Sequence, residues 1–355
     1  MIRPSDIIYL GRSRFQRSHA NLIQLMHTAS GFVKLGWDVQ VILPPWPRRL
    51  SVNARLQELD VDPAPELSYS QLLHPRWSFW PFIWKYRRDL RMARVIYTRV
   101  ARISLALTRA GLPNHLEVHD VEALSQKDQI EPIIAHHRKG LIRTLIPISN
   151  SAAQLLINAG AAPERIHVAH SGVKLEAYTG LPPFDPANLI RPRVIHLGKL
   201  SQPRGLKIFH YLAQRGVCEI SIISADKDSI PNALHHPPVS LSEVPTWYAR
   251  SDLTLLPYQP DISTAATMSP IKMFEAMAAG RPIIASDLPT IREILRHEYS
   301  ALLVDPHDLE AWAQAMDRLR QDRSLAVRLA ANARAEASNY SWERRAQGIA
   351  RAMGL

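Results

Sequence analysis

Apolar residues along this chain gather in short runs of four or five, and each run is followed by a longer segment in which they recur three or four residues apart. The short runs predict buried strands and the spaced segments predict helices. Strand, helix and strand in succession predict a parallel βαβ unit. In the first half, strands are expected at residues 6–10, 39–43, 94–98, 116–119 and 165–169, and helices at residues 19–35, 101–110 and 151–159.

Residues 181–193 interrupt this alternation with four prolines and no periodicity, which is typical of a linker. The pattern then resumes, with strands expected at residues 194–197, 220–224, 253–256, 282–286 and 301–304, and helices at residues 205–214, 244–249, 309–319, 324–338 and 342–353. Residues 48–75 show no clear pattern.

We therefore expect an α/β protein with two doubly wound, Rossmann-like domains. The first is expected over residues 1–180, the second over residues 194–338, and a C-terminal helix over residues 339–355 should pack back toward the first domain. Ligands of such sheets bind at the carboxyl ends of the strands, so the site is expected in a cleft between the two domains.

Residues 269–287 carry the strongest local signals in the second half. Ser269 suits an N-cap and Pro270 the first helical position, and Gly280 suits the end of the helix. The free N–H groups at such a helix start attract phosphate. Glu275 is a carboxylate inside this otherwise apolar helix.

Composition narrows the class of protein. The 355 residues carry a net charge of +11, which predicts an anionic partner. A single cysteine excludes an internal disulfide framework and fits reducing cytosol. No run reaches the roughly 18–20 apolar residues of a membrane span, and the N-terminus shows no signal-peptide pattern. The basic charge comes without a helix-turn-helix, zinc or aromatic RNA-binding signature, so nucleic acid is not expected as a partner.

Several motifs after residue 145, taken together, resemble the GT-B glycosyltransferases of family 4 (glycosyl transferases group 1, retaining). The motifs are Pro147-Ile-Ser149, His170-Ser-Gly172-Val173, Leu197-Gly-Lys199, Pro203-Arg204-Gly205, residues 244–258, the 269–287 segment, Val304-Asp-Pro306 and Tyr340-Ser-Trp342. The first half is similar more weakly, through Tyr97-Thr-Arg99 and Glu117-Val-His119-Asp120. The resemblance implies the GT-B fold.

The resemblance implies that Lys199 and Arg204 hold the diphosphate of a nucleotide-sugar donor. Both lie in one strand-to-helix loop, and cations placed where negative charge develops stabilise a leaving phosphate. The alternative is that they are two solvated loop cations. The resemblance also implies that Glu275 binds the donor ribose, whereas an ordinary i, i+3 ion pair with Lys272 is the structural alternative.

The sequence departs from the family at Thr267, where members carry a second acidic residue that contacts the transferred sugar. A threonine hydroxyl can still hydrogen-bond a sugar, and the backbone N–H groups of Met268, Ser269, Ile271 and Lys272 are expected to assist. Pro270 belongs to the same expected substrate-binding segment. The first loop also carries a single glycine, Gly11, in place of the family's frequent Gly-Gly pair.

His119 corresponds, by the resemblance, to a histidine near the transferred sugar, and it is expected to position the substrate; a surface imidazole is the alternative. Arg14, Arg17 and Arg99, with Arg12, are expected to line the first domain's side of the cleft and to bind an acidic or phosphorylated acceptor. Solvated charge is the alternative for these arginines.

No cofactor and no metal are expected. Asp226-Lys-Asp228 fits the Asp-x-Asp pattern, but by family position it lies away from the phosphates, in a turn.

Residues 77–91, Trp77–Arg91, combine the densest aromatic cluster of the chain with several basic residues. Aromatic residues beside a basic face are typical of an interfacial membrane segment. A core helix interrupted by Pro81 fits the same residues, and both interpretations stay open.

The predicted function is that of a retaining, metal-independent glycosyltransferase. It would move one sugar from a nucleotide-sugar to a glycan or lipid-linked acceptor in cell-surface polysaccharide or glycolipid synthesis, in the cytoplasm or at the inner face of the plasma membrane. The alternative is a non-catalytic GT-B protein that binds nucleotide or glycan beside a partner enzyme.

Overall fold

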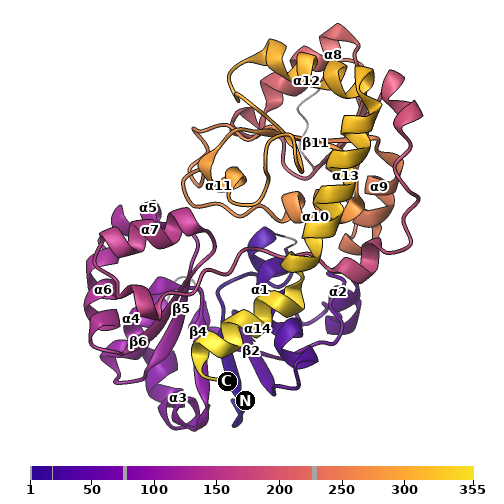
Figure 1. Cartoon of the computed structure of the whole chain (residues 1–355). Helices are drawn as coiled ribbons and strands as arrows, with labels where there is room; N and C mark the ends of the chain where they lie inside the picture. The colour runs from indigo at the N-terminus through magenta and orange to yellow at the C-terminus, as the bar shows by residue number, and fades with distance from the viewer. Residues whose placement is uncertain (1, 18, 75–77, 226–229) are drawn as a thin grey trace. The chain divides into compact units, whose positions relative to one another are not determined.

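The computed structural model describes residues 2–17, 19–74, 78–225 and 230–355. It divides into two units, residues 1–172 with 342–355, and residues 173–341. Each unit is an α/β domain built on a parallel sheet of six strands (Figure 1).

The first domain has the strand order β3-β2-β1-β4-β5-β6. Its strands are β1 (Ile7–Leu10), β2 (Val39–Leu43), β3 (Glu66–Tyr69), β4 (Val95–Thr98), β5 (Asn114–Val118) and β6 (Ile142–Pro147). Its helices are α1 (Ala20–Lys34), α2 (Val52–Glu58), α3 (Trp80–Met92), α4 (Ala101–Arg109), α5 (Val121–Ser125), α6 (Ile130–Arg138), α7 (Asn150–Asn158) and α14 (Trp342–Met353). The final helix α14 packs along α1.

The second domain repeats this plan with the order β12-β11-β10-β7-β8-β9. Its strands are β7 (Arg193–Leu197), β8 (Glu219–Ile223), β9 (Leu234–His236), β10 (Leu253–Leu256), β11 (Ile283–Ser286) and β12 (Leu302–Val304). Its helices are α8 (Leu206–Arg215), α9 (Val244–Arg250), α10 (Ile271–Ala279), α11 (Pro289–Arg292), α12 (Leu309–Gln321) and α13 (Arg323–Ala337).

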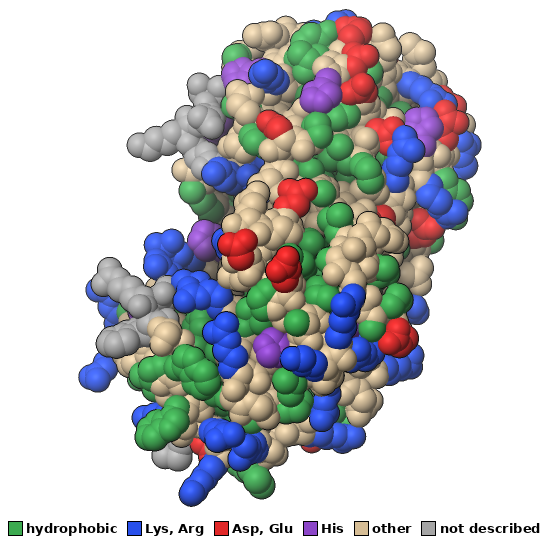
Figure 2. Space-filling model, turned by 90° about the vertical axis from the view of Figure 1, so that its left-hand side faces the viewer, with side chains coloured by type: hydrophobic (Ala, Val, Ile, Leu, Met, Phe, Trp, Pro, Cys, Tyr) green, Lys and Arg blue, Asp and Glu red, His purple; other side chains and the backbone are tan. Residues whose placement is uncertain are grey.

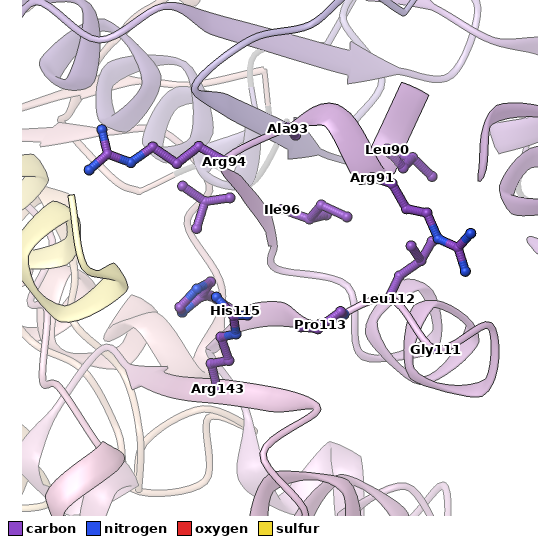
Figure 3. Close-up of a pocket in the computed structure, with 11 residues that line it drawn as sticks. Leu90, Arg91, Ala93, Arg94, Ile96, Gly111, Leu112, Pro113, His115 and Arg143 are labelled. Carbon is purple, nitrogen blue, oxygen red and sulfur yellow. The ribbon is translucent and has the colours of Figure 1, made fainter. Parts of the chain in front are cut away.

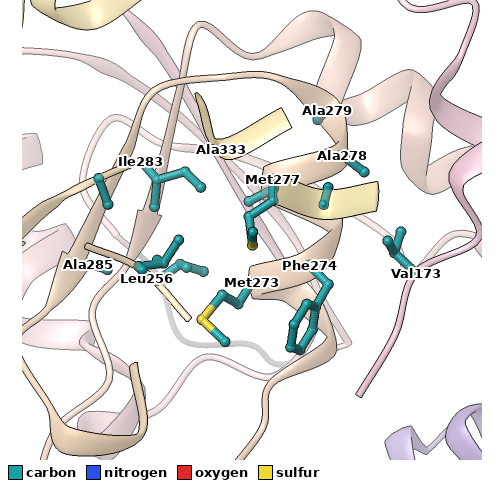
Figure 4. Close-up of a cluster of buried hydrophobic side chains, with 14 of the residues drawn as sticks. Val173, Leu256, Met273, Phe274, Met277, Ala278, Ala279, Ile283, Ala285 and Ala333 are labelled. Atoms are coloured by element: carbon teal, nitrogen blue, oxygen red, sulfur yellow. The ribbon is translucent and has the colours of Figure 1, made fainter. Parts of the chain in front are cut away.

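Helix α10 forms the centre of one apolar layer of the second domain. Figure 4 shows Met273, Phe274 and Met277 projecting from α10 into the layer, where Leu256 and Ile283 of the sheet meet them. Burial of each such side chain stabilises the fold by about 1.5–3 kcal/mol. The alternating strand residues face a second layer beneath α8 and α12, so the sheet is covered on both sides.

The expected linker was wrong. Residues 181–193 lie inside the second domain, where a 3₁₀ helix at Pro186–Ile190 packs on α12 and α13 and Leu189 is only 1% exposed. The chain instead leaves the first domain at residue 172 and returns to it at residue 342. Prolines alone do not mark a domain boundary when an apolar residue between them reaches a core.

Three smaller expectations also differ. Residues 165–169 form no strand; Ile166 makes only an isolated bridge to Leu145. Helix α10 begins at Ile271 with Pro270 as its N-cap, one residue later than expected, and no side chain caps it. Pro81 lies in the first turn of α3, where its missing N–H costs nothing, so it does not interrupt that helix.

Candidate functional site

Each sheet reverses its strand order once, and ligands of doubly wound folds bind outside the carboxyl ends of the strands at that point. In the first domain the reversal lies between β1 and β4, and in the second between β7 and β10. Gly11 and Arg99 follow the first pair, and Gly198 and Pro257 follow the second. The predicted site residues therefore fall at the expected edge of each sheet.

In the first domain, His119 is held on both sides of its ring. Its Nδ1 accepts a hydrogen bond of 3.1 Å from Nη2 of Arg99, and its Nε2–H donates to the carboxylate of Glu117. A guanidinium can only donate, so these partners select the neutral tautomer protonated on Nε2. Burial lowers the pKa of His119 to about 4, and Arg99 acts in the same direction.

Glu117 is a buried carboxylate with three polar neighbours. Besides His119, it accepts a hydrogen bond from the hydroxyl of Tyr97 and lies 3.0 Å from Nη2 of Arg345. These neighbours outweigh the burial and hold the pKa of Glu117 well below its ordinary value. Sequence analysis did not assign a role to Glu117, although its place two residues before His119 puts both on one face of the strand.

Arg345 reaches Glu117 from the last helix, α14. Its other nitrogens donate to the hydroxyl of Thr28 at 2.7 Å and to the carbonyl of His170 at 2.9 Å. One guanidinium therefore joins α14 to α1, β5 and the segment that leaves the domain.

The other predicted site residues of this domain differ in their burial and contacts. Arg99 is half-buried and donates to the carbonyl of Asn21 at 2.8 Å, so it fixes the start of α1 as well as His119. Arg14 and Arg17 are exposed. Gly11 is buried, and a β-carbon there would lie 2.6 Å from Cδ1 of Leu25, so this position serves close packing.

In the second domain, the loop after β7 is shaped by two glycines with left-handed backbone, Gly198 and Gly205, both with φ of 85°. A β-carbon on Gly205 would lie 2.6 Å from the carbonyl oxygen of Pro257, so the loop can approach the end of β10 only with glycine there. Within the loop, the ring of His196 donates from Nε2 to the carbonyl of Lys199 at 3.1 Å. Burial lowers the pKa of His196 to about 3, which keeps that anchor neutral.

Three cations surround this loop. Lys199 is exposed, Arg204 is half-buried, and Nζ of Lys272 would lie 3.5 Å from a β-carbon on Gly198. Burial lowers the pKa of Lys272 to about 8, and Arg204 adds to the effect. From the sequence, the side chain of Lys272 is expected only to pair with Glu275, whereas the structure places it beside the loop predicted to bind phosphate.

Glu275 lies on the same helix as Lys272 and is half-buried. Burial raises its pKa to about 7, although Lys272 opposes the shift. No ion pair joins the two side chains within the described part of the chain. The simple i, i+3 ion pair considered from the sequence is therefore not formed, and the carboxylate keeps acceptor capacity for a ligand.

The segment before α10 is more enclosed than expected. Thr267 is 1% exposed, Met268 and Ser269 are also buried, and Pro270 and Ile271 are half-buried. The role assigned to these residues toward a donor sugar stays a prediction. Asp226 to Asp228 lie outside the described residues, and elsewhere in the structure no group of three or more His, Cys, Asp or Glu side chains could hold a metal ion.

Comparison with known proteins places this arrangement in a family. The family described as Glycosyl transferases group 1 matches residues 219–322, a range that contains β10, α10 and Glu275. Over this range the chain matches the group 1 glycosyltransferases. The resemblance stated from its motifs is confirmed.

Among the curated relatives is the D-inositol 3-phosphate glycosyltransferase of Pseudarthrobacter chlorophenolicus, 27% identical over 258 residues, which are 63% of this chain and 59% of the relative. That of Salinispora arenicola is 33% identical over 119 residues, 33% of this chain and 25% of the relative. The chain thus spans between a quarter and three fifths of the length of these two relatives.

Solved structures share the fold over the whole chain. Anabaena Alr3699/HepE in complex with UDP and glucose has a TM-score of 0.74 at 17% identity and covers 99% of both chains. A mutant of S. aureus TarM in complex with Fondaparinux, alpha-GlcNAc-glycerol and UDP has a TM-score of 0.72 at 10% identity, with 99% of this chain and 100% of that chain covered. At such identities the likeness shows the fold, and the predicted GT-B fold is confirmed.

Proposed function

We propose that this protein is a retaining, metal-independent glycosyltransferase that moves a sugar from a nucleotide-sugar to a glycan or lipid-linked acceptor in cell-surface polysaccharide or glycolipid synthesis. The observation that carries the proposal is the set of cations around the Gly198 loop, where Lys199, Arg204 and Lys272 adjoin the unpaired carboxylate of Glu275. A nucleoside diphosphate requires cations for its phosphates and a hydrogen-bond acceptor for the hydroxyls of its ribose.

The chemistry follows from the charge that develops on the leaving group. As the bond to the sugar breaks, negative charge grows on the diphosphate, and Lys199, Arg204 and Lys272 stabilise it. Glu275 accepts hydrogen bonds from the ribose hydroxyls. The departing phosphate itself takes the proton of the acceptor hydroxyl.

His119 acts in this scheme by position. Both of its ring nitrogens are engaged, by Arg99 and Glu117, and its low pKa keeps the ring neutral near pH 7. It orients the substrate and does not serve as a general base.

UDP-sugars are the donors that we propose. The HepE structures contain UDP, UDP-glucose or UDP with glucose, and they cover the whole of this chain. We further propose a phosphorylated acceptor, bound by the exposed Arg14 and Arg17. The curated relatives are named for the acceptor D-inositol 3-phosphate, and the two arginines follow β1 at the sheet's carboxyl edge.

Membrane association is also proposed, through α3 at the cytoplasmic face of the plasma membrane. The described part of the aromatic segment, residues 78–91, resolves into a core side and a solvent side: Phe82 and Ile83 are buried, whereas Trp84 is 81% exposed. Trp77 lies outside the described residues. No described helix is long and apolar enough to cross a bilayer.

Donor turnover tests the proposed activity. With UDP-glucose, UDP-N-acetylglucosamine and UDP-galactose, we expect slow UDP release by the full chain. Arg204→Ala should lower that rate about 10²–10³-fold. Glu275→Ala should raise the KM for the donor. Lys207→Ala, an exposed cation on α8, is the control and should leave the rate unchanged.

A non-catalytic nucleotide-binding protein remains the second candidate, favoured by Thr267 at the position of the family's acidic residue. It would be stabilised against heat by UDP through Arg204 and Glu275, yet release no UDP from any sugar nucleotide with or without added acceptor. That outcome would overturn the enzymatic proposal.

A further inference from the structure

A cavity lies at the amino edge of the first domain's sheet, where β4, β5 and β6 begin, opposite the edge that carries His119. It encloses about 300 Å³ and combines an apolar lining, including Ile96 and Leu112, with the basic side chains of Arg91, Arg94, Arg143 and His115 (Figure 3). His115 precedes His119 by four residues along β5, which corresponds to about 13 Å in a strand. The cavity is therefore separate from the site at the carboxyl edge.

His115 lacks a partner at this place. Its ring is only 2% exposed, yet neither Nδ1 nor Nε2 has a hydrogen-bond partner among the described residues. Buried polar side chains in folded proteins are almost always hydrogen-bonded, so an imidazole that lines a roomy cavity calls for a partner in that cavity.

The cavity's charge indicates the sign of that partner. Arg91, Arg94 and Arg143 are exposed, and the described structure gives none of them an ion pair. No Asp or Glu lines the cavity. Three uncompensated guanidinium groups around one opening favour an anion.

The arrangement of these side chains distinguishes those that would contact the anion first from those at the rim of the cavity. Figure 3 shows the side chains of His115 and Arg143 next to each other, as expected from neighbouring strands β5 and β6. The guanidinium groups of Arg91 and Arg94 are turned outward in this view, and that of Arg94 lies 5.1 Å from the centre of the Trp37 ring. Exposed side chains of this length change rotamer within nanoseconds, so the rim arginines can follow a ligand inward.

We propose that this cavity is a phosphate-binding site distinct from the donor and acceptor sites. His115 and Arg143 would donate to the phosphate oxygens from within, and Arg91 and Arg94 would close over them. Guanidinium forks match phosphate geometry with paired, charge-assisted hydrogen bonds. The phosphate comes either from a small phosphorylated molecule or from a monoester lipid headgroup, because α3, whose last turn contributes Arg91, also carries the exposed Trp84.

The test uses the imidazole of His115 as a local probe, because phosphate is also expected to bind at the other two sites. Its NMR signal is identified in the full chain as the one missing from His115→Gln, and inorganic phosphate is titrated at fixed ionic strength with saturating UDP. A parallel titration uses phosphatidylcholine vesicles with and without phosphatidic acid. The variants are Arg143→Gln with Arg91→Gln, and the control is Arg48→Gln with Arg49→Gln, which removes the same charge from exposed positions after β2.

We expect the His115 signal to shift with one of the two phosphates, and the midpoint to rise at least tenfold in the Arg91, Arg143 variant but not in the control. A shift with phosphatidic acid alone assigns the site to lipid, and a shift with inorganic phosphate assigns it to a small molecule. No shift with either, or equal midpoints in the variant and the control, would overturn the proposal. We expect these variants to leave UDP release from the donor unchanged. Failure of the phosphate-site proposal can therefore be distinguished from failure of the proposed glycosyltransferase activity.

Discussion

At the residue scale, Glu117 organises the polar cluster of the first domain. A carboxylate this deeply buried is tolerated because Tyr97, His119 and Arg345 surround it. The same contacts fix the tautomer of His119, so a structural ion pair and the orientation of the ring that we propose to face the substrate depend on one group.

Replacement of Arg345 by methionine should therefore destabilise the protein strongly. It leaves Glu117 as an uncompensated buried charge, a change that costs about 3–5 kcal/mol in other proteins. Urea denaturation of the full chain measures the effect, with Arg351→Met, an exposed residue of the same helix, as the control expected to change stability by under about 0.5 kcal/mol.

Adding Glu117→Gln to Arg345→Met should recover part of the loss, because the remaining buried group is then neutral. If Arg345→Met and Arg351→Met denature at the same urea concentration, the buried pair of Glu117 and Arg345 does not stabilise the protein.

At the scale of single elements, helix α10 combines a side buried in the core with a half-buried polar side that we propose binds the nucleotide. Met273, Phe274 and Met277 hold it in the second domain, whereas Lys272 and Glu275 lie at its half-buried side. Burial shifts the two pKa values toward each other, to about 8 for Lys272 and about 7 for Glu275. Both side chains are charged together only in a narrow range of pH.

UDP affinity should consequently be highest between about pH 7 and 8. Below pH 7 Glu275 gains a proton and loses acceptor capacity toward the ribose; above pH 8 Lys272 loses its charge toward the diphosphate. Each limb should fall by up to about tenfold per pH unit. Calorimetric titration with UDP between pH 6.5 and 9 measures the profile.

Glu275→Gln should flatten the acid limb and Lys272→Gln the alkaline limb, whereas Lys207→Gln should retain both. A profile that stays flat in the unmodified chain would contradict the assignment of these two residues to the nucleotide.

A second element, α14, depends on close approach to α1. A β-carbon on Gly31 would lie 2.7 Å from Cβ of Ala346 and 2.8 Å from the carbonyl of Trp342, and the ring of His27 stacks on that of Trp342 with centroids 5.4 Å apart. The smallest side chain is thus needed where the chain's last helix meets its first.

At the scale of the whole molecule, the net charge is unevenly divided. The first domain carries 25 Lys and Arg against 14 Asp and Glu, and the second carries 18 of each, so the whole excess of +11 belongs to the first domain. Figure 2 shows blue Lys and Arg side chains spread over the first domain, in the lower part of the view, with few red carboxylates between them. An anionic surface would attract that domain.

Vesicles test this attraction together with α3. The full chain should float with vesicles containing about a third phosphatidylglycerol at low salt, and high salt should release it because the charges are exposed. Trp84→Ala with Trp80→Ala should reduce flotation several-fold at equal charge.

The control is Val327→Ala, an exposed apolar residue of α13 in the second domain, which should float like the unmodified chain. Failure of the unmodified chain to float at low salt would end the membrane proposal.

The sequence by itself determined the elements whose signals are local. Apolar runs located β1, β2, β4, β7 and β10, and glycines located the ends of α1, α4 and α10, because strand burial and left-handed turns leave a trace within a few residues. The ordered motifs identified the family and the GT-B fold. Lys199 and Arg204 follow β7, His119 follows β5 and Glu275 lies on α10, and their roles stay predictions.

Only the tertiary structure decided what depends on contacts between distant residues. Leu189 drew the supposed linker into the second domain's core, and Arg345 paired with Glu117 across more than 200 positions of sequence. Lys272 reached the Gly198 loop, and His115 was left unpaired beside three arginines. Burial and pairing depend on which residues are neighbours in space, so no periodicity or motif in the sequence predicts them.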